Sequence, residues 1–88
     1  MITNNNSIFI IYEMFAQETQ IIVFAEGKPC NISYCRSLPK RIADVAIMTA
    51  ARLGPSQLYV AAPQFLYDEL VTLIGNNNNI TKIERVEE

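Results

Sequence analysis

The sequence predicts an α+β, α/β-like domain in which a three-stranded antiparallel meander precedes a helix, a strand, a helix and a last strand around one mixed sheet. Two apolar runs rich in β-branched and aromatic residues and a third segment in which apolar and polar residues alternate lie before residue 37, separated by short polar segments. Two segments with helical spacing of apolar residues then flank a short apolar run at 58–61. A strand between two helices requires crossover connections, so we expect the last strands to be parallel.

The chain length favours a single domain. Its 88 residues are enough for one hydrophobic core. We expect a polar, disordered lead-in over residues 1–6 and one compact domain over residues 7–88. Half of the residues are hydrophobic, a high share for so small a domain. This excess indicates that another subunit or partner covers part of the apolar surface.

The first strand is expected over residues 8–15, where apolar residues follow one another without alternation. Such runs are typical of a central strand covered on both faces. Further strands are expected over 20–25 and 31–36, joined by a turn in which Gly27 takes a positive φ. The last of these alternates, as a half-buried strand does, with Ile32 and Tyr34 on one face and Ser33 and Cys35 on the other.

The first helix is expected to begin at Leu38 or Pro39, with Ser37 as its N-cap, and to end at Leu53 before Gly54. Its core-facing stripe is Ile42, Val45, Ala46, Thr49 and Leu53. More apolar residues widen this surface beyond one stripe, and we take them as a candidate interface: Ile47, Met48, Ala50 and Ala51. The width of the apolar surface is the main indication of a partner.

The run at 58–61 predicts a buried strand that leads directly into a helix over residues 64–74. Pro63 suits the opening of this helix, because its φ is fixed near the helical value and it lacks the N–H that a first turn leaves unpaired. The expected core contacts of the helix are Leu66, Leu70, Leu73 and Ile74. Residues 80–86 read as a charged edge strand, although the three-residue spacing of Ile80, Ile83 and Val86 is also helical.

This order of elements resembles the ribonuclease H-like arrangement. The nuclease form of that arrangement needs several carboxylates that converge on two metal ions. Glu13 and Asp44 match two of the positions, but Ala61 and Ala62 occupy the third. We therefore expect no metal site and no nuclease activity.

Composition restricts the function further. The net charge of −2 and the absence of histidine argue against a general nucleic-acid binder and against histidine-based catalysis. Cys30 and Cys35 are expected to be unpaired thiols. We expect no catalytic residue and no cofactor, and a soluble, cytoplasmic protein, because the chain has neither a long apolar run nor a basic leader.

The leading hypothesis is a non-catalytic interaction module that forms a homodimer or docks on a larger host protein complex. A virus- or mobile-element-encoded inhibitor would suit the same pattern. The alternative is a ribonuclease H-like remnant that binds nucleic acid or a small anion beside Pro63. Its anion site is the start of the second helix, at Gln64 and Phe65. Its basic patch is Arg36, Lys40 and Arg41.

Overall fold

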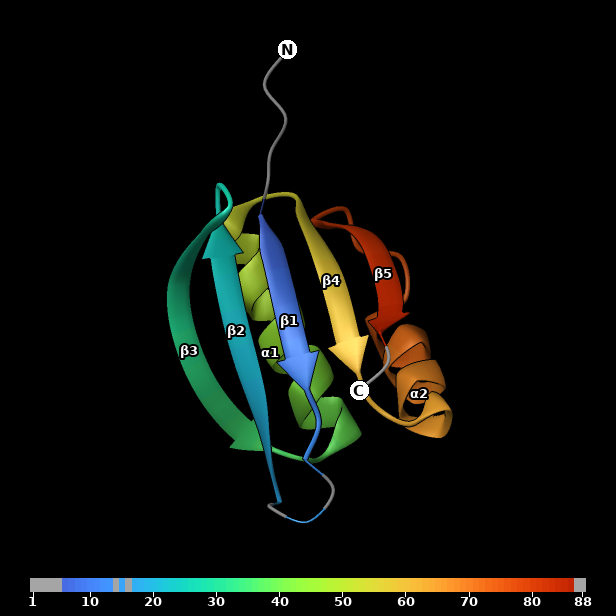
Figure 1. Ribbon diagram of the computed structural model, residues 1–88. Coiled ribbons are helices and arrows are strands. Elements are labelled where there is room, and N and C mark those ends of the chain that lie inside the picture. Colours follow the sequence, from blue (N-terminus) through green and yellow to red (C-terminus); the bar gives the residue numbers. More distant parts are fainter. Residues whose placement is uncertain (1–5, 14, 16, 87–88) are drawn as a thin grey trace.

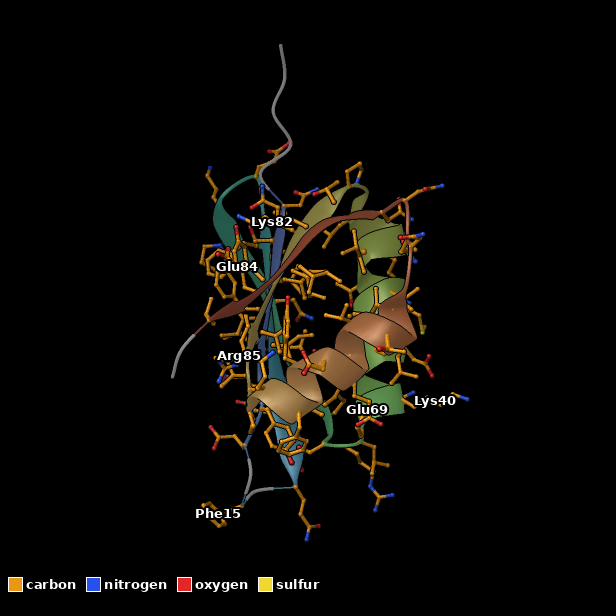
Figure 2. All side chains as sticks on the ribbon, turned by 90° about the vertical axis from the view of Figure 1, so that its right-hand side faces the viewer. Phe15, Lys40, Glu69, Lys82, Glu84 and Arg85 are labelled. Atoms are coloured by element: carbon orange, nitrogen blue, oxygen red, sulfur yellow. The ribbon has the colours of Figure 1, made fainter. Side chains whose placement is uncertain are left out.

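The computed structural model describes residues 6–13, 15 and 17–86. Within them, five strands form one mixed sheet in the order β3-β2-β1-β4-β5, and both helices lie on the same face of that sheet (Figures 1 and 2). The elements are β1 (Ser7–Ile11), β2 (Glu18–Ala25), β3 (Lys28–Arg36), α1 (Pro39–Leu53), β4 (Ser56–Ala61), α2 (Gln64–Ile74) and β5 (Ile80–Val86). The predicted fold class and element order are confirmed.

Strand directions follow the connections. Both β1–β2 and β2–β3 are antiparallel, because short turns join these strands. In contrast, β1–β4 and β4–β5 are parallel, since a helix-containing connection precedes β4 and another precedes β5. The central position therefore belongs to β1, which pairs with β2 on one side and with β4 on the other.

The hydrophobic core lies between the sheet and the two helices. Alternate residues of the strands point into it, because side chains of a strand alternate between the two faces. In the central strand these are Ile8 and Ile10, which have no exposed surface. The remaining buried apolar side chains are Ile21, Val23, Ile42, Ala43, Ala46, Ala50, Leu58, Val60, Ala62, Leu66, Leu70 and Ile74.

The first strand is shorter than predicted. It ends at Ile11 because its parallel neighbour β4 ends at Ala61, the residue opposite. Beyond it Phe15 is 95% exposed rather than part of a strand. Of the other residues expected in this strand and the following turn, Met14 and Ala16 lie outside the described residues.

The expectation that β1 is covered on both faces is wrong for the described chain. Ile8 and Ile10 are buried under the helices, but Ser7, Phe9 and Ile11 are only half-buried on the opposite face. Both helices pack on one side (Figure 2). The strand is therefore apolar on two faces although the described part of the chain covers only one of them.

The start of α1 also differs from the prediction. Its N-cap position is Leu38, which makes no side-chain capping bond. Ser37 does not cap the helix, because its hydroxyl lies 2.8 Å from the hydroxyl of buried Thr19. The helix begins at Pro39, one of the two predicted starts, and ends at Leu53 as predicted.

The buried faces of the helices are rotated relative to the expected stripes. In α1 the alanines Ala43 and Ala50 are buried, whereas Val45, Thr49 and Leu53 are only partly so. Small side chains allow close approach, and α1 packs against α2 as well as against the sheet. In α2 the predicted core residue Leu73 is exposed.

The two ends of the described chain belong to the packed domain. Asn6, which we assigned to a disordered lead-in, is 4% exposed; residues 1–5 of that lead-in lie outside the described residues. At the other end, residues 80–86 form an edge strand. A bulge between Ile80 and Lys82 puts Ile80 and Ile83 on the same face, which explains a three-residue spacing in a strand.

Candidate interaction surfaces

The residues of the predicted interface on α1 differ in their burial. Ala50 is fully buried and cannot be part of a surface. Ile47 is half-buried and packs against the core. Only Met48, at 55% exposure, and Ala51 are accessible. The broad apolar surface of α1 is therefore used mainly for contacts with the sheet and α2.

The predicted anion site lies at the start of α2. Pro63 occupies the N-cap position, and its carbonyl accepts hydrogen bonds from the N–H groups of Leu66 and Tyr67. Phe65 is exposed. The side-chain amide of Gln64 donates to Asp68 in the same helix over 2.8 Å. The side chain of Gln64 is therefore engaged within the helix.

The three predicted basic residues do not form one patch. Arg36 lines a cavity with Tyr12, Gln17, Ser37 and Leu38. Arg41 lines a separate cavity between β3 and α1. Lys40 projects from α1 away from the sheet (Figure 2). The end of β3 and two different sides of α1 therefore carry the three positive charges.

The acidic residues weighed for metal chemistry are both exposed. Glu13 follows β1, and Asp44 lies on α1. Among residues 6–13, 15 and 17–86, no three side chains of His, Cys, Asp or Glu lie close enough together to hold a metal ion. The strand β4 ends at Ala61, where a nuclease of this element order would place a carboxylate.

The face of the sheet opposite the helices, which we call the open face, has no covering element within the described residues (Figure 2). Its centre is aromatic: the ring of Phe9 stacks on Tyr59 with centroids 5.0 Å apart, and Phe24 meets Phe9 edge-on at 5.5 Å. On the edge strand β3, Ile32 and Tyr34 are both more than half exposed. By their strand register, the other apolar residues of the open face are Ile11, Ile22, Ala61 and Val86.

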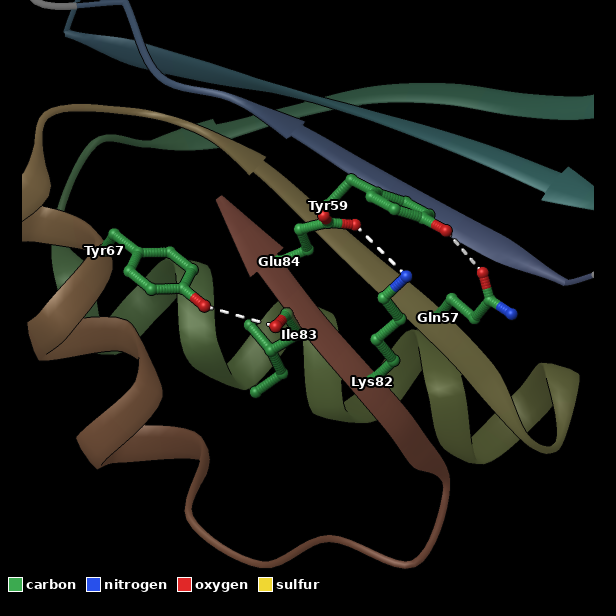
Figure 3. Close-up of polar contacts among 6 residues, drawn as sticks. All are labelled: Gln57, Tyr59, Tyr67, Lys82, Ile83 and Glu84. Atoms are coloured by element: carbon green, nitrogen blue, oxygen red, sulfur yellow. Dashed lines mark hydrogen bonds and ion pairs between the residues drawn. The ribbon is translucent and has the colours of Figure 1, made fainter. Parts of the chain in front are cut away.

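The charges of the open face occur as opposite pairs. On β5, Lys82 and Glu84 lie 3.2 Å apart, on the side of the sheet away from the helices (Figures 2 and 3). The ion pair with Glu84 raises the pKa of Lys82, which also lies 5.7 Å from the centre of the Tyr59 ring. At the other side of the sheet, Glu18 lies opposite Arg36 in the β2–β3 register. The open face is therefore apolar at its centre and electrically balanced at its margins.

A second accessible feature is a groove of about 230 Å³ between β3 and α1, which we call the β3–α1 groove. One wall consists of Asn31 and Ser33. The other is a stripe of α1 residues: Arg41, Val45, Met48, Thr49 and Arg52. Further along β3, burial raises the pKa of the Cys35 thiol and the nearby Arg41 guanidinium partly offsets this.

No protein-family model matches this chain, and no curated protein matches it. Neither helix in the described part of the chain has the length and apolar content needed to cross a membrane.

The sequence contains an indication of both the open face and the β3–α1 groove, although neither surface was predicted from it. The apolar residues on both faces of β1 predicted that both faces are covered. In the structure, those on the face opposite the helices belong to the open face. The spacing of Arg41, Val45, Met48 and Arg52 places them on one side of a helix. That this side borders the edge strand β3 depends on the tertiary structure.

Proposed function

We propose that the protein is a non-catalytic interaction module that pairs with a second copy of itself through the open face of its sheet. One observation carries this proposal: the central strand is apolar on both faces, and only one face is covered by helices. Sheets with one uncovered face normally carry polar residues there. An apolar face of this extent favours a further protein layer.

The charge pattern favours a second copy over nucleic acid. In a two-fold symmetric interface the same patch faces itself, so a patch with net charge would repel its counterpart. Here Lys82 forms an ion pair with Glu84, and Glu18 lies opposite Arg36 in the strand register, so the marginal charges balance. A balanced face has no net attraction for phosphates, which nucleic-acid binding requires. Charge depletion at the centre is a feature of homodimer interfaces.

The size of the open face is also sufficient. Five strands about 4.8 Å apart and about 20 Å long give roughly 500 Å² for each copy. Two copies then bury roughly 1,000 Å², the lower limit for a specific interface. Packed sheets align their strands within about 30°, which accommodates the twist of this sheet.

Two equally exposed residues allow a matched test. Ile32 lies on the open face at 56% exposure, and Met48 lies on α1 at 55%. Neither Ile32→Glu nor Met48→Glu removes a core contact, so both variants should fold. A symmetric dimer contains two copies of residue 32, and burial of an isoleucine contributes about 1.5–3 kcal/mol. Ile32→Glu should therefore raise the dimer dissociation constant by at least about 100-fold.

The measurement is sedimentation velocity over roughly 1–100 µM protein, a range that spans micromolar dimer affinities. We expect the wild type and Met48→Glu to dimerise and Ile32→Glu to be monomeric. A wild-type monomer throughout, or a dimer that survives Ile32→Glu, would overturn the proposal. A dimer lost only in Met48→Glu would transfer the interface to α1. We also propose that the protein is cytoplasmic, as the sequence predicts.

A further inference from the structure

Between the bulge at Cys30 and its charged end at Arg36, the edge strand β3 lacks the features that normally protect a sheet edge. Edge strands expose unpaired N–H and C=O groups, and charged residues or proline usually block the approach of another strand. The opposite edge, β5, carries Lys82, Glu84 and Arg85 along its length. In β3 the charges and the proline are confined to its ends, at Lys28, Pro29 and Arg36. The middle of β3, residues 30–35, is uncharged.

Beside this unprotected segment lies the β3–α1 groove. β3 is at the outer edge of the sheet (Figure 1). The helix α1 contacts it on the helical side. A peptide that extends the sheet beside β3 directs every second side chain toward that side. Edge strand and neighbouring helix together thus offer both backbone pairing and side-chain contacts, the two components of recognition by strand addition.

The charge in the groove is positive. Arg41 and Arg52 both line it, and neither takes part in an ion pair within the part of the chain that the structure describes. Between them lie Val45 and Met48. The two arginines are separated by three helical turns, about 16 Å. An extended peptide covers this distance in about five residues.

We propose that the β3–α1 groove binds an extended acidic segment of another protein, which pairs with β3 and places two carboxylates at Arg41 and Arg52. Because alternate side chains face the groove, the recognised pattern is acidic, any residue, apolar, any residue, acidic. The central apolar side chain contacts Met48, and the carboxylates accept hydrogen bonds from the guanidinium groups. This site is separate from the open face and does not depend on dimerisation.

The test uses the 88-residue chain and a blocked, fluorescein-labelled peptide that has glutamate, valine and glutamate at alternate positions and threonine between them. Binding is measured by fluorescence anisotropy at low ionic strength. We expect Arg41→Ala with Arg52→Ala to weaken binding about tenfold. Lys40→Ala is the matched control, because Lys40 is an α1 cation that points away from the sheet. It should bind the peptide as the wild type does.

Three further results decide the proposal. A peptide with glutamine in place of glutamate should bind about tenfold more weakly, and added salt should remove most of the difference between the two peptides. Amide NMR signals of residues 30–36 should shift on peptide binding. The proposal fails if the double arginine variant binds the peptide normally or if the shifts map to β5. It also fails if a single-stranded oligonucleotide binds through the two arginines while the peptide does not.

Discussion

Asn6 is expected to contribute to stability because its side chain makes hydrogen bonds to three separate segments of the chain. Its side-chain amide donates to the carbonyl of Leu53 over 3.2 Å and to that of Pro55 over 3.5 Å. Its side-chain oxygen accepts from the N–H of Glu26 over 3.2 Å. A single side chain thus connects the start of β1, the end of α1 and the β2–β3 turn, and it is almost completely buried.

The effect of Asn6→Ala follows from these bonds. The contact to Pro55 is at the limit of a hydrogen bond and counts for little. Each of the other two is partly buried and contributes about 1 kcal/mol, and the partner groups left without a hydrogen bond add to the loss. The free energy of unfolding should fall by about 2–3 kcal/mol. For a domain of this size that corresponds to a decrease in Tm of roughly 10–20 °C.

The measurement is urea and thermal unfolding followed by circular dichroism. Asn78→Ala is the control, since this asparagine is exposed in the loop before β5, and its free energy of unfolding should change by less than about 0.5 kcal/mol. A loss below about 0.5 kcal/mol for Asn6→Ala would refute the reasoning, because the three segments would then be held together without this side chain.

A second variant tests the donor bonds separately. Asn6→Asp keeps the acceptor for Glu26 but places a carboxylate oxygen against the carbonyls of Leu53 and Pro55. Burial and these carbonyls favour the protonated form, so the folded-state pKa should be above the unfolded value. The folded state then binds more protons, and stability should fall as pH rises from the unfolded pKa through the folded one. A stability difference from wild type that does not change with pH would contradict the two donor bonds.

Two further predictions concern single side chains. Burial raises the pKa of Cys35 while Arg41 lowers it, so iodoacetamide should modify exposed Cys30 before Cys35, and Arg41→Ala should slow the modification of Cys35 further. The folded-state pKa of Cys35 is above its ordinary value, so the contribution of this thiol to stability is complete below the ordinary pKa and is lost as pH rises through the folded-state pKa. Equal modification rates for Cys30 and Cys35, or an alkaline decrease in stability that Cys35→Ser leaves unchanged, would contradict this. The hydroxyl of Tyr67 donates to the carbonyl of Ile83 over 3.2 Å and joins α2 to β5 (Figure 3). Tyr67→Phe should therefore cost about 1 kcal/mol in urea unfolding, and an unchanged midpoint would show that packing alone holds β5 in place.

The sequence by itself determined which segments are strands and which are helices, except for residues 80–86, whose spacing also suits a helix and which are a strand because they pair with β4. Apolar periodicity reports local geometry, and the signals at Pro39, Gly54 and Gly75 act within one or two turns. The bounds of α1 and the strand–helix connection at Pro63 were therefore predictable. The lengths of the strands were not, because β1 ends where its neighbour β4 ends, and pairing between distant segments sets that point.

The tertiary structure alone decided which apolar surface stays accessible. The sequence showed an excess of apolar residues but assigned it to α1, since a helix wheel contains no information on how many neighbours the helix has. In the fold, α1 contacts both the sheet and α2, which buries Ala43 and Ala50. Both helices lie on one side, so the excess appears on the opposite face of the sheet. Burial is a property of the assembled layers, and for that reason no single segment of the sequence specifies it.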